Sequence, residues 1–101
     1  MNKLTSVVRV DPLLEELIPG FLTSVRNDVN AVRDALDRND FGTIVRIGHN
    51  IKGAGGGYGF EVISDIGTTI NRAAQDADAT KIAHEIEHLS TYLSQVQIIY
   101  E

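Results

Sequence analysis

The stretch IAHEIEHLSTYLSQVQIIY, residues 82–100, indicates most clearly how this chain folds. Its apolar side chains recur at intervals of four and three residues, at Ile82, Ile86, Leu89, Leu93, Val96 and Tyr100. A helix brings residues with this spacing onto one face, so the pattern predicts one amphipathic helix that runs as far as Tyr100. The polar residues between them then form an opposite face that lies in solvent.

The same helical spacing continues upstream of this stretch. It predicts three further helices: from Phe21 to Leu36, from Phe41 into the glycine-rich run at residues 53–59, and from Phe60 to Ala74. The connections between them are short. Asp40 and Asp78 stand just before two of the helices and are expected to be their N-caps, because aspartate accepts hydrogen bonds from the free N–H groups of a first turn.

The N-terminal part follows a different pattern. Residues 1–10 show no periodicity, so we expect a loose arm there and the domain proper over residues 11–101. Asp11 followed by Pro12 is typical of a helix start, and Pro19 interrupts that helix. No strand-like alternation is present. The expected fold is therefore all-α: an antiparallel up-down four-helix bundle with a short additional N-terminal helix.

Composition excludes several classes of function. The 101 residues leave room for one domain, and the net charge of −5 argues against a nucleic-acid or anionic-membrane surface. The absence of cysteine excludes disulfides and thiolate zinc sites. The longest uncharged stretch, residues 89–100, is too short to span a bilayer. We expect a monomeric, cytoplasmic domain with neither nucleic-acid nor membrane partners.

One histidine lies on the outer side of its predicted helix. On a helical wheel His49 points away from Ile44 and Ile51, which mark the core. Within about 60° of it on the wheel lie three glycines, two cations and one valine: Gly42, Gly53, Gly56, Arg46, Lys52 and Val45. Each glycine inside a helix costs about 1 kcal/mol relative to alanine. Something must offset that cost.

Two explanations remain open from the residues alone. In the first, Gly48 and Gly55 let a neighbouring helix approach, and His49 is an ordinary surface histidine. In the second, the neutral imidazole of His49 attacks a phosphoryl group, which needs a lone pair and an unobstructed approach. Gly53, one turn away, removes an obstruction, and Lys52 can offset the charge of the transferred group.

The string His49-Asn50-Ile51-Lys52-Gly53, followed after five residues by Gly59, resembles the signature of histidine-containing phosphotransfer (HPt) domains. The resemblance implies a four-helix bundle whose exposed His49 accepts a phosphoryl group from an aspartyl-phosphate or phosphohistidine donor. That group then passes to an aspartate of a response-regulator receiver domain. It also implies that Lys52 is the electrostatic partner, that Gly53 keeps the docking face clear and that Gly59 ends the helix.

The same resemblance implies a role in a two-component phosphorelay. The partners would be receiver domains or a hybrid sensor histidine kinase, and the chain would carry phosphate without being an enzyme on its own. No cofactor is expected, because the receiver would supply Mg²⁺. Arg46 and Gly56 are expected to support the site. The chain departs from the family at Asn71, where many members carry Glu or Gln, so an orienting role for this residue does not follow.

Two other interpretations compete with phosphotransfer. A helical module could bind a partner without moving phosphate, but it would not need the His-Lys-Gly constellation. His84-Glu85-Ile86-Glu87-His88 matches the H-E-x-x-H zinc pattern. Both of its histidines fall on the polar side of their helix and no third ligand stands out, so we expect no metal site.

Overall fold

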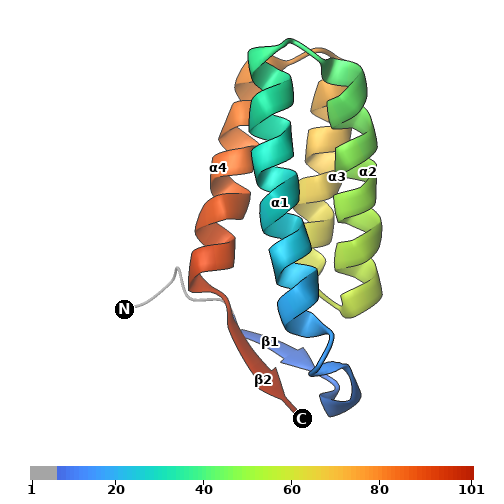
Figure 1. Ribbon diagram of the computed structural model, residues 1–101, viewed down its shortest axis with the longest axis vertical. Helices are drawn as coiled ribbons and strands as arrows, with labels where there is room; N and C mark the ends of the chain where they lie inside the picture. Colours follow the sequence, from blue (N-terminus) through green and yellow to red (C-terminus); the bar gives the residue numbers. More distant parts are fainter. Residues whose placement is uncertain (1–6) are drawn as a thin grey trace.

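The computed structural model describes residues 7–101, which form four long helices with a small sheet at one end (Figure 1). The long helices are α1 (Ile18–Asp37), α2 (Phe41–Tyr58), α3 (Glu61–Gln75) and α4 (Ala79–Gln95). A 3₁₀ helix, η1 (Pro12–Leu14), precedes α1, and the two strands are β1 (Val7–Val10) and β2 (Gln97–Tyr100). The prediction of a four-helix bundle with a short N-terminal helix is confirmed.

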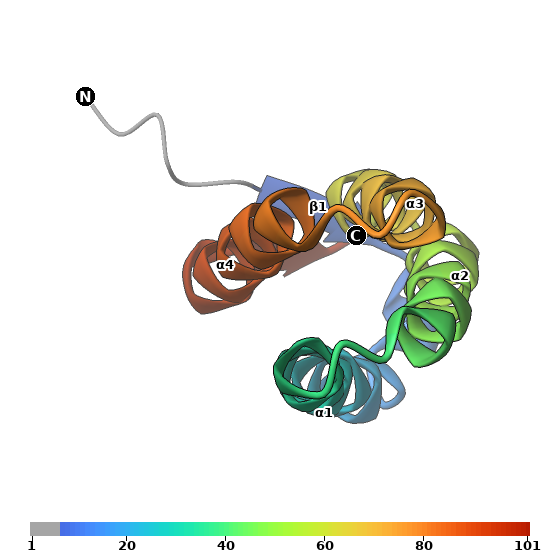
Figure 2. The same cartoon turned by 90° about the horizontal axis from the view of Figure 1, so that it is seen from above.

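The four helices follow one another around the bundle axis, as the view from above shows (Figure 2). Each packs against its neighbours in the chain, and α1 also packs against α4. The predicted apolar stripes point inward and are buried, for example at Val32, Ile51, Ile70 and Ile86. Among residues 7–101, no helix is long and apolar enough to cross a membrane.

The three connections between the long helices have the same construction. Each helix is followed by one residue with positive φ: Asn39, Gly59 and Ala77. The next residue is the N-cap of the following helix: Asp40, Phe60 and Asp78. Its N–H donates to the carbonyl five residues earlier, at 2.8 to 2.9 Å, which is the Schellman arrangement. Because only two or three residues separate one helix from the next, consecutive helices run antiparallel.

Side chains cap two of these helix starts, those of α2 and α4, as the sequence predicts. A carboxylate oxygen of Asp40 accepts a hydrogen bond from the Thr43 N–H, and one of Asp78 accepts from the Lys81 N–H, both at 3.1 Å. Bonds from the Thr43 hydroxyl and N–H hold the pKa of Asp40 below its usual value. Pro19 lies in the first turn of α1, where its missing N–H costs no hydrogen bond.

The sheet corrects two expectations. Residues 7–10 of the expected loose arm are strand β1, and residues 1–6 lie outside the described residues. The last helix ends at Gln95, and the residues expected to continue it to Tyr100 form β2. The two strands pair in parallel, with Val7 opposite Gln97. Valine and isoleucine favour strands where a partner strand is available, and this partner is ninety positions away, so no local pattern predicts it.

Candidate functional site

Helix α2 separates a buried side from an exposed side, and His49 lies on the exposed one. Ile44 and Ile51 are fully buried, and Ile47 is 9% exposed. His49 and the adjacent Asn50 are exposed. The predicted orientation of this helix is confirmed, so the imidazole is accessible to a partner molecule.

Two cations accompany the histidine on the exposed side. Arg46 and Lys52 are exposed and lie three residues before and after His49. Within residues 7–101, neither side chain has a carboxylate within ion-pair distance; the recorded pairs join Arg9 to Glu101, Arg33 to Glu87, Arg38 to Asp40 and His88 to Glu85. Both charges are therefore available to an anion placed at His49.

The glycines on this exposed side leave open space. Among residues 7–101, a Cβ atom built on Gly53 would have no atom within 4 Å apart from its two chain neighbours and the nearby backbone of its own helix. One built on Gly56 would meet only the Ser64 hydroxyl, at 3.7 Å. Packing inside the bundle therefore does not require glycine at either position. Beyond His49, the positions of Gly53 and Gly56 therefore leave gaps between the exposed side chains of α2.

The glycines on the opposite side of α2 have a packing role. A Cβ on Gly48 would lie 2.8 Å from the backbone nitrogen of Asn71, and one on Gly55 would lie 2.7 Å from that of Ser64. From α3, Gly67 faces the backbone of Lys52 in the same way, at 2.5 Å. The expectation that Gly48 and Gly55 permit a close helix approach is confirmed, and α2 and α3 pack more closely than any other pair.

Two side chains of α3 hold the backbone of α2 on either side of His49. The Asn71 side-chain amide donates to the Val45 carbonyl at 2.7 Å, and the Ser64 hydroxyl donates to the Lys52 carbonyl at 3.0 Å. Gln75 in turn donates to the Asn71 side-chain oxygen at 2.6 Å. Helix geometry makes the Val45 carbonyl the acceptor of the His49 N–H. Asn71 therefore contacts the turn that carries His49 through its backbone.

Sequence analysis missed Ser64 and Gln75 and left Asn71 without a role. The one available signal was spacing: Ser64 and Asn71 are seven residues apart, as are Val45 and Lys52. Two helix positions seven residues apart lie on one face. Two antiparallel helices can therefore form two contacts with this spacing, here Asn71 with Val45 and Ser64 with Lys52. Polar residues at such positions are common on any helix surface, so the spacing alone does not predict these contacts.

Gly59 ends α2 as expected. Its φ of 84° is in the left-handed region, where residues with a side chain are strained, and its N–H returns to carbonyls of the last helical turn. The chain turns there into α3. Gly59 therefore lies at the end of the helix, beyond the exposed surface next to His49.

The H-E-x-x-H segment lies on α4, and its histidines, His84 and His88, are exposed. The imidazole nitrogen Nδ1 of His88 lies 3.7 Å from a carboxylate oxygen of Glu85. Among residues 7–101, no three histidine, cysteine, aspartate or glutamate side chains form a group that could hold a metal ion. That this segment binds no zinc stays a prediction.

Comparison with known proteins gives one finding. A family model described as Hpt domain matches residues 16–98. No curated protein and no solved structure matches the chain. The matched span contains all four long helices, with His49 in the second of them.

Proposed function

Because this chain belongs to the Hpt domain family, whose members act in phosphorelays of two-component signalling, we propose that it carries a phosphoryl group on His49. The donor and the acceptor are aspartates of response-regulator receiver domains, and one receiver is part of a hybrid sensor histidine kinase. The chain works as a monomeric carrier between them.

The proposed step exchanges one bond to phosphorus for another. A lone pair of the neutral imidazole attacks phosphorus of the receiver's aspartyl phosphate. The nitrogen–phosphorus bond forms while the bond from phosphorus to the aspartate oxygen breaks, and the carboxylate leaves with its electron pair. The other ring nitrogen keeps its proton throughout. The return step is the reverse reaction with the next receiver.

The single observation that supports this proposal best is the exposed surface around His49. The transfer needs a partner to bring its aspartate into line with the imidazole. The open space at Gly53 permits that approach, and packing does not account for the glycine there. An ordinary surface histidine would not need this arrangement.

Charge stabilisation is the second contribution of this chain. The transferred phosphoryl group carries negative charge on its outer oxygens, which positive groups nearby stabilise. Lys52 is one helical turn from His49 and has no ion-pair partner in the described part of the chain, so it can turn towards the phosphoryl group. Arg46 lies one turn on the other side and supports it.

The remaining half of the reactive site belongs to the partner. We propose that the receiver supplies both the aspartate and the Mg²⁺ that neutralises the phosphoryl oxygens. The chain then acts as a carrier rather than as an enzyme on its own. This division predicts that receiver, Mg²⁺ and His49 are all needed for transfer.

Phosphate labelling tests the proposal. The protein is incubated with Mg²⁺ and a panel of receiver domains carrying labelled aspartyl phosphate, and the acid-labile label is mapped by peptide. We expect label on His49 alone, none in His49→Gln, and unchanged labelling in the matched controls His84→Gln and His88→Gln. Label on His84 or His88 would contradict the assignment. Receiver binding without label would instead support the non-catalytic interaction module.

A further inference from the structure

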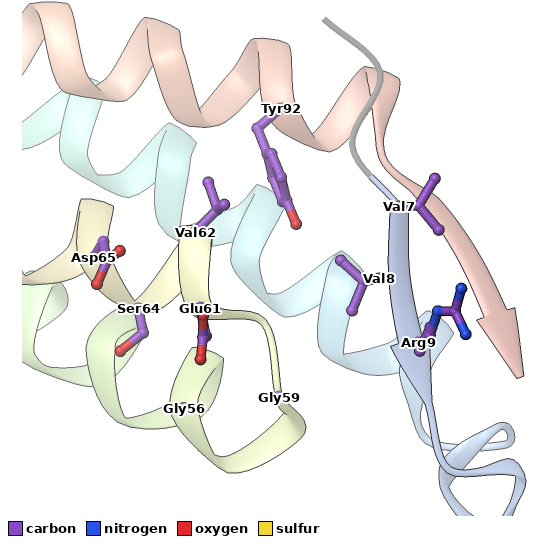
Figure 3. Close-up of a pocket in the computed structure, with 10 residues that line it drawn as sticks. All are labelled: Val7, Val8, Arg9, Gly56, Gly59, Glu61, Val62, Ser64, Asp65 and Tyr92. Atoms are coloured by element: carbon purple, nitrogen blue, oxygen red, sulfur yellow. The ribbon is translucent and has the colours of Figure 1, made fainter. Parts of the chain in front are cut away.

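A pocket of about 840 Å³ opens where β1, the end of α2, the start of α3 and α4 meet (Figure 3). Val8 and Val62 form part of its wall. Gly56 and Gly59 leave its α2 side free of side chains. Nothing in the proposed transfer at His49 uses this pocket.

Tyr92 of α4 also lines the pocket. The ring descends from α4 between the α3 start and β1 (Figure 3). The residue is 6% exposed, and its buried hydroxyl has no hydrogen-bond partner among residues 7–101. Burial raises the pKa of Tyr92, so the hydroxyl stays protonated at neutral pH and can both donate and accept. Buried polar groups normally have a partner, so this hydroxyl marks a place for a ligand group.

The α3 side of the pocket is acidic. Glu61 and Asp65 lie on the first turns of α3, four residues apart and so on one face, and both are exposed. In the described part of the chain neither makes an ion pair, whereas the one basic lining residue, Arg9, is paired with Glu101. This side of the pocket therefore attracts a positive group.

The pocket adjoins the exposed surface next to His49. Gly56 lines the pocket and follows His49 by seven residues, which places it on the same side of α2 and about 10 Å further along the axis. A protein domain that docks over His49 can therefore extend over the pocket as well. Interfaces of that kind extend over about 800 Å² on each partner, which is ample to include both.

We propose that this pocket receives a lysine or arginine side chain of the receiver domain that docks over His49. The alkyl part lies against Val8 and Val62, the cationic head pairs with Glu61 and Asp65, and one of its N–H groups donates to the Tyr92 hydroxyl. Long basic side chains suit such a site because they combine an apolar stem with a charged end. This inference rests on the proposed function, since it names the partner by the transfer at His49.

Transfer kinetics give the first test. The rate of labelling is measured against the concentration of a phosphorylated receiver for the parent and for Glu61→Gln/Asp65→Asn. We expect KM to rise about tenfold with kcat unchanged, because two charge-assisted contacts to the docked receiver are lost. Asp34→Asn/Asp37→Asn, which removes two exposed charges from the far end of α1, is the matched control and should leave KM unchanged.

Tyr92→Phe separates a binding role from a structural one. It removes only the unpartnered hydroxyl, so the fold should melt no lower than the parent while KM rises about threefold. A variant with parental KM would show that the hydroxyl takes no part in docking. Unchanged KM in the double variant would overturn the proposal while leaving transfer at His49 intact.

A second measurement does not depend on phosphotransfer. Nuclear magnetic resonance of the ¹⁵N-labelled protein follows a titration with Nα-acetyl-arginine amide, with Nα-acetyl-glutamine amide as the uncharged control. We expect saturating shifts of the Gly59, Glu61 and Asp65 amides with arginine only, lost in the double variant. Shifts that do not saturate would contradict the proposal that the pocket binds a cationic side chain. Saturating shifts in a protein that gains no label on His49 would overturn the receiver as occupant and the proposed function together, leaving a cation-binding pocket.

Discussion

The glycines of α2 fall into two groups on opposite sides of the helix. On the side facing α3, added Cβ atoms at Gly48 and Gly55 would lie less than 3 Å from backbone atoms of α3. On the side of His49, an added Cβ at Gly53 would meet nothing within 4 Å in the part of the chain that the structure describes. Both groups weaken the helix to the same degree. Packing against α3 explains Gly48 and Gly55, whereas only a partner outside the bundle explains Gly53. The same residue type therefore indicates close packing on one side of α2 and docking on the other.

The largest expected effect is on the packed side. Gly48→Ala or Gly55→Ala forces a methyl group against the backbone of α3, which cannot rotate away as a side chain would. We expect each to lower the free energy of unfolding by about 3 kcal/mol, measured by urea denaturation. A loss below about 1 kcal/mol would mean that the two helices can separate at low cost, and the comparison would fail on this side.

The next effect is on function. Gly53→Gln places a long side chain on the open surface one turn from His49, so it should block the approach of a receiver. We expect transfer to slow at least about tenfold while the melting temperature stays at or above that of the parent. The matched control is Gly20→Gln, at an equally open position on α1. Parental transfer kinetics in Gly53→Gln would show that the docking surface lies elsewhere.

A smaller substitution at the same site measures how much glycine at position 53 lowers the stability of the helix. Gly53→Ala adds one methyl group in open space within a helix. We expect it to stabilise the protein by up to about 1 kcal/mol, the reverse of the effect at Gly48. Thermal and urea unfolding of Gly53→Ala and Gly48→Ala, measured side by side, give the change in unfolding free energy for each. Destabilisation at Gly53 would remove the contrast between the two sides of α2.

The smallest effect concerns Lys52. Because its charge lies in solvent, Lys52→Ala should slow transfer only about threefold and change stability by less than about 0.5 kcal/mol. Lys81→Ala, another exposed lysine, is the control for a general change in charge. If the unfolding free energy of Lys52→Ala fell sharply while transfer kept the parental rate, Lys52 would have a structural role instead.

Helix spacing, capping residues and the helical wheel correctly predicted the features that depend on neighbouring residues of one helix. The apolar stripes place Ile51 and Ile86 in the core, Asp40 and Asp78 cap their helices, and the wheel orients His49 outward, all as observed. In each case the determining interaction lies within one or two turns of the same helix.

Interactions between distant segments could not be predicted in this way. The expected helix end at Tyr100 fits the helical spacing, yet pairing with β1 draws those residues into a strand. Nothing in the sequence sets Gly67 apart. Glycine is needed there only because the backbone of Lys52 in α2 lies against it. Likewise, Asn71 gains its role from the Val45 carbonyl on another helix. Each depends on a partner that only the folded chain brings near.

The pairing of β1 with β2 also has a consequence for folding kinetics. Each connection between long helices closes a short loop, whereas the strand ladder joins Val7 to Gln97 across almost the whole chain. Closing so long a loop costs entropy that nearby contacts do not. We therefore expect the helices to assemble first and the ladder to form last. Val10 of β1 is 2% exposed and lies in the core. Formation of the ladder therefore also covers the core at the end of the bundle where the sheet lies. The ladder is thus the segment whose opening should appear first in native-state hydrogen exchange.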